Sequence, residues 1–298
     1  MLIEMAVGDA YGAAFEFTRT PQIPNDLSRF GCHPKGGLDQ GSYTDDTMRA
    51  ISNTYVLLDG KTIDAYRPDA YIRALLDVFQ EDRRPGWSGR FQQMLETHVD
   101  RPPVELMRAL QRRGSNGCLM GIAPLGYLRT ANDVRLAATM QTVATHSAAT
   151  VPYAQIIALA AHHLLHGGTT RSVADYAIAE AEWHSDADAL RFRAMLDDEP
   201  PIPDMPAPTI SACALWALGN FDSSAEALVW ACSRGGDTDS LGAVTMALAS
   251  CATDIAQDLP DHLIDNVDTA ANRAMLRKLD GRLTATFLNE LKKDKHEQ

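Results

Sequence analysis

The sequence predicts an all-α protein. Apolar residues recur at the three- and four-residue spacing of a helix along most of the chain, and no segment keeps the alternation of a half-buried strand. Many of these segments are rich in alanine, which lets helices approach closely and suits a core of helices packed on helices. Glycine, proline and aspartate separate them. We therefore expect helices joined by ordered loops around one core.

The apolar periodicity places each expected helix. In residues 47–58, the side chains of Met48, Ile51, Tyr55 and Leu58 fall on one face. The same pattern returns in seven further segments: 71–79, 134–146, 151–165, 172–182, 210–218, 225–232 and 241–251.

Three segments are predicted as connections. Residues 18–41 carry three prolines and four glycines, which indicates a long ordered loop or a lid. Residues 82–89 and 197–208 are two shorter connections. None of them resembles a flexible interdomain linker, and no repeat of 20–50 residues is found. We therefore treat residues 1–298 as one domain, with a core to about residue 291 that includes one terminal helix after Leu259, and a polar tail at 292–298.

The composition narrows the function. The chain has 27 Lys and Arg against 39 Asp and Glu, a net charge of −12, which argues against a general binder of nucleic acid or anionic membrane. Nucleic acid is expected only as a modified substrate.

Five cysteines without a C-x-x-C pair argue against structural zinc and against a disulfide framework. The N-terminus has no basic signal-peptide region, and we expect the apolar runs to be too short for a bilayer, so we expect a cytoplasmic protein without a membrane partner.

Three acidic clusters stand out. The first runs from Gly8-Asp9-Ala10-Tyr11-Gly12 to Glu16, the second is Gly41-Ser42-Tyr43-Thr44-Asp45-Asp46-Thr47-Met48, and the third is Arg234-Gly235-Gly236-Asp237-Thr238-Asp239-Ser240. The second and third lie just before predicted helices, where short polar side chains cap exposed N–H groups. Each of these two, taken alone, is explained as a capped helix start.

Taken together, the second and third clusters exceed what two caps require. They carry four carboxylates and several hydroxyls. If the two helix starts converge, the four negative charges repel one another strongly, and two divalent cations would neutralise them. Carboxylate and hydroxyl oxygens favour Mg²⁺, Mn²⁺ or Ca²⁺ over zinc. The spacing alone leaves open whether the clusters meet.

Five motifs occur in a fixed order. They are G-D-A-x-G-x-x-x-E at 8–16, T-D-D-T-M at 44–48, N-G-x-x-M at 116–120, T-H-S at 145–147 and G-G-D-T-D-S at 235–240. This series resembles the ADP-ribosylglycohydrolase family, which includes the dinitrogenase-reductase-activating glycohydrolases. The resemblance implies a single orthogonal all-α domain around a dinuclear Mg²⁺ or Mn²⁺ site. It also implies cleavage of the glycosidic bond between ADP-ribose and an acceptor, which is a protein side chain or a small molecule.

The resemblance also implies roles for particular residues. The positions that match metal ligands are Thr44, Asp45, Asp46, Asp237, Asp239 and Ser240. Glu16 matches the catalytic acid, base or water-positioning carboxylate, with Asp45 and Asp239 beside it and Asp9 as a weaker candidate. The positions expected to contact ADP-ribose are Ser115, Asn116, Gly117, Met120, His146, Gly235 and Gly236. Main-chain N–H groups at 115–117 are expected to cradle the diphosphate.

The chain departs from the family pattern at three places. Gly121 stands where the family usually has arginine, so one positive or structural contact is missing. Few residues precede Gly8, which implies a short first helix or a late start. Ala148 and Ala149 follow T-H-S in place of the family's further His and Pro. The predicted metal set is complete, whereas the substrate cleft is altered.

Other functions stay open on the sequence alone. The alternatives are a hydrolase of small ADP-ribose esters or metabolite N-glycosides, a non-catalytic ADP-ribose-binding protein on the same fold, and a dimetal phosphohydrolase that releases phosphate. His162 and His166 are four residues apart and offer a zinc pair, but we interpret them as a polar helix edge. Trp87 is interpreted as packing, although it offers a surface for a purine, and Arg83, Arg84 and Arg90 as a solvated loop.

Overall fold

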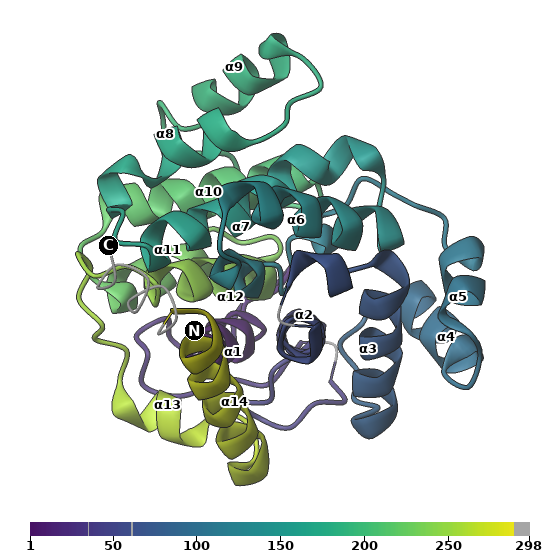
Figure 1. Ribbon diagram of the computed structural model, residues 1–298. Helices are drawn as coiled ribbons and strands as arrows, with labels where there is room; N and C mark the ends of the chain where they lie inside the picture. Colours follow the sequence, from purple (N-terminus) through teal and green to yellow (C-terminus); the bar gives the residue numbers. More distant parts are fainter. Residues whose placement is uncertain (35, 61, 289–298) are drawn as a thin grey trace.

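The fold is built from helices around a central pair. The structure is a computed structural model that describes residues 1–34, 36–60 and 62–288, and these residues form helices and no strand (Figure 1). The α-helices are α1 (Leu2–Gly12), α2 (Asp45–Gly60), α3 (Pro68–Glu81), α4 (Gly89–His98), α5 (Pro103–Ala109), α6 (Ala131–Thr145), α7 (Val151–Leu165), α8 (Thr170–Glu180), α9 (Asp186–Ala194), α10 (Ala207–Asn220), α11 (Ser224–Ser233), α12 (Thr238–Ala249), α13 (Asp261–Asn266) and α14 (Ala270–Leu283). Short helical turns lie at Ile63–Ala65, Asn116–Cys118, Ala123–Tyr127 and Ala148–Thr150, and a π-helical turn lies at Thr284–Leu288.

The all-α prediction is confirmed, and every helix expected from periodicity is present. The expectation of one terminal helix was wrong, because α13 and α14 both follow Leu259. Three helices were not expected: α4, α5 and α9. Each buries only one or two side chains, so it carries too few apolar positions to show a period. Residues 18–41 contain no helix among those described, as predicted. The polar tail at 292–298 lies outside the described residues.

Helices α1 and α12 form the centre of the protein, where their backbones touch. Every residue of α12 is buried, and so are nearly all residues of α1. A Cβ atom on Gly8 would overlap the carbonyl oxygen of Gly242, and one on Gly12 would overlap the carbonyl oxygen of Thr238. Only glycine permits this approach. The contact holds the end of α1, which leads to Glu16, against the start of α12, which carries Asp239.

One helical run is longer and more apolar than the sequence analysis allowed. The run Ala148–Leu165, which contains α7, has the length and composition of a membrane span, but 72% of it is buried inside the protein. α7 packs against α6, α8 and the turn Ala123–Tyr127. The expectation that no apolar run reaches this length was therefore wrong, because a central core helix meets the same criterion.

The histidines of α7 make local contacts. The Nδ1 atom of His162 lies 3.0 Å from the carbonyl oxygen of Gly126, and the Nε2 atom of His163 lies 2.8 Å from the Ser172 hydroxyl. The Nδ1 atom of His166 lies 2.8 Å from the carbonyl oxygen of His162. Among the described residues, none of the three belongs to a group of side chains with metal-binding spacing. These contacts account for the three imidazoles, but His162 is buried, so it does not lie on an exposed polar edge.

Candidate metal centre and substrate cleft

Asp9 of α1 caps the start of α2. Its carboxylate is fully buried and accepts hydrogen bonds from the Thr44 N–H at 2.9 Å, the Thr44 hydroxyl at 2.8 Å, the Thr47 N–H at 3.0 Å and the Thr47 hydroxyl at 2.6 Å. Both oxygens are occupied, and Asp9 is not among the described residues that line the cleft. Asp9 is therefore a structural residue, and its candidacy as a catalytic carboxylate was wrong.

Because Asp9 provides this cap, the carboxylates of Asp45 and Asp46 are not needed for it. The same holds at the start of α12, where the Asp237 side chain caps no backbone N–H. The simple interpretation of the two clusters as helix caps therefore does not account for their carboxylates. A different use for these charges is required.

The two helix starts converge, as the predicted metal site requires. One oxygen of the Asp46 carboxylate lies 3.4 Å from the Thr44 hydroxyl and 3.4 Å from the Ser240 hydroxyl. All three residues are at most 1% exposed. The other oxygen of Asp46, Oδ1, is buried and has no hydrogen-bond partner. Burying a carboxylate oxygen without a hydrogen-bond partner lowers the stability of the fold unless a ligand binds that oxygen.

Asp45, Asp237 and Asp239 lie close to this buried group and line the cleft. Asp237 accepts a hydrogen bond of 2.8 Å from the side-chain amide of Asn116. Burial, with help from Asp9 and Asp237, raises the pKa of Asp45 to about 7 against the opposing charge of Arg49. Burial and the neighbouring carboxylates also raise the pKa of Asp46 and of Asp239 well above its usual range. Without a cation, the protein therefore disfavours the ionised forms of Asp45, Asp46 and Asp239.

The residues present fit a divalent cation. The donors are hard oxygens, the charges are buried and mutually repelling, and one oxygen of Asp46 has no hydrogen-bond partner. A cation would stabilise the ionised carboxylates that burial now disfavours. The residues that would hold it are Thr44, Asp45, Asp46, Asp237, Asp239 and Ser240.

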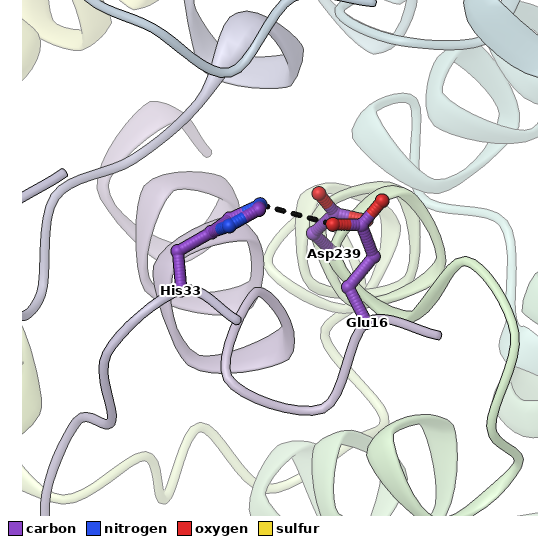
Figure 2. A group of neighbouring side chains, drawn as sticks. All are labelled: Glu16, His33 and Asp239. Atoms are coloured by element: carbon purple, nitrogen blue, oxygen red, sulfur yellow. Dashed lines mark ion pairs between the residues drawn. The ribbon is translucent and has the colours of Figure 1, made fainter. Parts of the chain in front are cut away.

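A histidine that the sequence analysis missed lies at the edge of this cluster. The Nε2 atom of His33 is 2.9 Å from the Glu16 carboxylate, and Asp239 lies beside Glu16 (Figure 2). One ligand atom from each of the three residues lies within 4.8 Å of the other two. His33 belongs to the long loop at 18–41, where a single histidine between cysteine and proline forms no recognisable pattern. Only the path of the loop brings it to Glu16.

The acidic cluster forms part of the wall of a cavity of about 660 Å³. This volume is within the range of small-molecule sites, roughly 300–1,000 Å³. The predicted substrate residues that line it are Ser115, Asn116, Gly117, Met120 and His146, and the predicted catalytic residues that line it are Glu16, Asp45 and Asp239.

The loop at 115–117 differs in detail from what was expected. The Asn116 N–H donates to the carbonyl oxygen of Met205 at 2.7 Å, so it is not available to a phosphate. A Cβ atom on Gly117 would lie 2.8 Å from the Nε2 atom of His146, so glycine makes room for the imidazole. Burial lowers the pKa of His146 to about 3, with a further contribution from Arg49. His146 is therefore a neutral side chain that supports this loop.

Gly235 and Gly236 shape the site from outside the cleft. They are not among the described residues that line the cavity, so a direct substrate contact, as the sequence analysis expected, is not supported. Both have positive φ, 68° and 75°, which favours glycine. A Cβ atom on Gly236 would overlap the carbonyl oxygen of Pro203, and its own carbonyl accepts a 2.8 Å hydrogen bond from Phe17 N–H. The two glycines thus turn the chain so that Asp237 enters the cleft.

The backbone at position 121 requires glycine, which explains why the arginine usual in the family is absent here. Its φ is +67°, and a Cβ atom there would overlap the backbone N of Ala50 in α2. A positive charge reaches the cleft instead from Arg49, which is 3% exposed and whose Nε lies 3.5 Å from the Asp45 carboxylate. Its guanidinium lies 5.2 Å from the Trp87 ring centre and 4.7 Å from that of Phe91.

The loop at 82–89 is more ordered than expected. Arg84 is largely buried and bonds the Tyr43 carbonyl oxygen at 3.0 Å and the Asp268 carboxylate at 2.5 Å, so it is not a solvated side chain. Trp87 packs edge-on against Phe79 with ring centres 6.1 Å apart, as expected for packing, and it also lines the cleft. Arg90 is exposed at the cleft wall.

Comparison with known proteins agrees with the motifs. The sequence profile of the ADP-ribosylglycohydrolase family matches residues 1–292. The chain belongs to the ADP-ribosylglycohydrolase family. A solved structure described as an ADP-ribosylglycohydrolase-related protein complex is similar in fold, with a TM-score of 0.74 and 23% sequence identity over 96% of this chain and 95% of that chain. A comparison with curated proteins found no match. ADP-ribosylglycohydrolases are hydrolases that are typically metal-dependent, which agrees with the buried cluster of acidic residues and histidine.

Proposed function

We propose that this protein is a metal-dependent hydrolase that cleaves the glycosidic bond between ADP-ribose and an acceptor. The observation that carries the proposal is the convergence of Asp46, Thr44 and Ser240 below a cleft lined by Asp45, Asp237 and Asp239. Family membership supports the reaction class. The substrate is an ADP-ribose-modified protein or a small ADP-ribose conjugate.

Two Mg²⁺ or Mn²⁺ ions are the proposed cofactors. Their number follows from charge, because four carboxylates carry −4 when ionised and two divalent cations carry +4. Held by Thr44, Asp45, Asp46, Asp237, Asp239 and Ser240, the cations would supply Lewis acidity toward the ribose hydroxyls. The protein residues then orient this ribose within the cleft, and the rest of the ADP-ribose extends along the wall formed by Ser115, Gly117 and Met120.

Glu16 is the proposed residue at the reacting atoms. Hydrolysis adds the oxygen of water to the anomeric carbon, breaks the bond from that carbon to the acceptor, and returns a proton to the acceptor. A carboxylate beside the anomeric carbon accepts a hydrogen bond from the attacking water and stabilises the oxocarbenium-like transition state. Glu16 lines the cleft next to Asp239, and its side chain is held in place by His33.

Arg49 is proposed to hold Asp45 in place. Its guanidinium is buried between aromatic rings and directs one N–H toward the Asp45 carboxylate. Asp45 therefore stays at the cleft wall in spite of repulsion from Asp46 and Asp237. Asp45 is thus held by a buried protein side chain and not by water.

The experiment is product analysis with arginine-, serine- and nucleic-acid-linked ADP-ribose, with EDTA and with Mg²⁺ or Mn²⁺ restored. We expect release of free ADP-ribose only with metal, and loss of release in Asp239→Asn, which removes one charge at nearly constant volume. Asp100→Asn is the matched control, because Asp100 is exposed. Release of inorganic phosphate in place of ADP-ribose would contradict the glycosidic reaction, and ADP-ribose binding without any release would indicate a binding protein.

A further inference from the structure

The group formed by Glu16, His33 and Asp239 differs in chemistry from the rest of the acidic cluster. The other proposed metal ligands offer only oxygen, whereas His33 offers an imidazole nitrogen. All three residues line the cleft, so an ion from solvent can reach them. All three are also buried, at 8%, 9% and 7% exposure, so the water around such an ion would be largely replaced by protein.

The spacing of the three side chains fits a shared ion. Their ligand atoms lie within 4.8 Å of one another, and the shortest separation is 2.9 Å between His33 Nε2 and Glu16. Donors bound to one ion at about 2.1 Å lie roughly 3–4 Å apart. Small side-chain movements would therefore bring all three donors onto one centre. Figure 2 shows the imidazole and the two carboxylates turned toward one another.

The surrounding charge favours a cation at this point. Asp239 is close to Asp237, Glu16 and Asp46, so negative charge gathers at this point and attracts a cation. The neutral form of His33 adds a lone pair without adding positive charge. A cation here would be held by Glu16 and Asp239 together and by the imidazole nitrogen of His33.

We propose that Glu16, His33 and Asp239 form a metal site with one nitrogen and two carboxylate donors, which selects a first-row transition ion such as Mn²⁺ over Mg²⁺. Imidazole suits transition ions, whereas Mg²⁺ keeps to oxygen donors. The site shares Asp239 with the proposed oxygen-only set, but its existence does not depend on hydrolytic activity. One consequence concerns Glu16. A carboxylate bound to a cation is ionised and has no proton to donate, so Glu16 would act in hydrolysis by orienting water.

The test is pulsed electron paramagnetic resonance of Mn²⁺ added to the metal-free full-length protein. A directly bound imidazole gives a ¹⁴N coupling on the Mn²⁺ signal. We expect this coupling in the wild type, its loss in His33→Gln, and its retention in His146→Gln. His146 is the matched control because it is the other buried histidine that lines the cleft. Circular dichroism of each variant verifies that it is folded.

Calorimetry of Mn²⁺ and Mg²⁺ binding provides the second measurement. In His33→Gln, Mn²⁺ affinity should fall by about 10- to 100-fold while Mg²⁺ affinity changes little. Mn²⁺ bound without ¹⁴N coupling, or an equal loss for both ions, overturns the nitrogen site and leaves the proposed hydrolase intact. A ¹⁴N coupling in a protein that releases no ADP-ribose supports the site and contradicts the proposed function.

Discussion

Removing metal should make the stability of this protein fall as pH rises from about 4 to about 7, the window set by Asp45. The native Asp45 carboxyl keeps its proton to about pH 7, whereas the unfolded one loses it near 3.8. Between these values the native state binds more protons, so the free energy of unfolding decreases with pH. A pKa difference of about 3 corresponds to ~4 kcal/mol from Asp45 alone. Asp46 and Asp239, whose pKa values are also raised, add to the decrease.

A bound divalent cation should cancel this loss, because it replaces the protons as the partner of the carboxylates. At a hundredfold excess over its Kd, a ligand that binds only the native state adds about 2.7 kcal/mol. Because protons compete with the ion, the stabilisation by Mn²⁺ or Mg²⁺ should be small near pH 4 and largest above pH 7.

The assay is urea unfolding followed by circular dichroism across this pH range, with EDTA, with Mn²⁺, and with NaCl at equal ionic strength. Asp45→Asn should flatten the slope in EDTA, although it also leaves Arg49 without its carboxylate partner and so lowers stability at every pH. Asp100→Asn, at an exposed position, should keep the wild-type slope. A metal-free wild type whose stability is constant or rises from pH 4 to 7 would refute the repulsive cluster.

Three further outcomes are expected. Glu16→Gln should lower kcat by about 10²–10⁴ with little change in ADP-ribose affinity measured by calorimetry, and a wild-type kcat would show that Glu16 takes no part in the reaction. Gly121→Ala should destabilise the fold by roughly 1–3 kcal/mol, because the new Cβ overlaps α2. Gly167→Ala is its control in the same urea assay, since Gly167 also has positive φ but no atom within 4 Å of a Cβ; equal losses in both variants would assign the effect to backbone strain. Asp9→Ala should cost roughly 1–3 kcal/mol, because it leaves buried N–H and hydroxyl groups of Thr44 and Thr47 without an acceptor, and it should weaken metal binding, because Asp9 holds Thr44; unchanged Mn²⁺ affinity in a folded variant would separate the cap from the metal site.

The long apolar helices were predictable because their periodicity is a local property of the sequence. Val151–Leu165 was expected with the same ends that the structure has, since proline follows its first residue and glycine follows its end. Helices α4, α5 and α9 were missed, because each is short and mostly exposed. The four clustered aspartates were also found from sequence, since each pair stands beside a predicted helix start with hydroxyl residues next to it.

Tertiary structure decided how these residues are used. Asp9 and Glu16 belong to the same motif, yet one caps α2 from beneath and the other enters the cleft, because α1 ends between them. His33 reaches Glu16 only through the path of a loop that has no periodicity. Gly121 and Arg49 are 72 residues apart, and only the contact between their backbones explains the glycine and places a positive charge in the cleft. The sequence by itself determined the helices and the inventory of ligands, because these follow from local spacing and residue chemistry. Which side chains share a site depends on long-range packing, and above all on the glycine contact between α1 and α12.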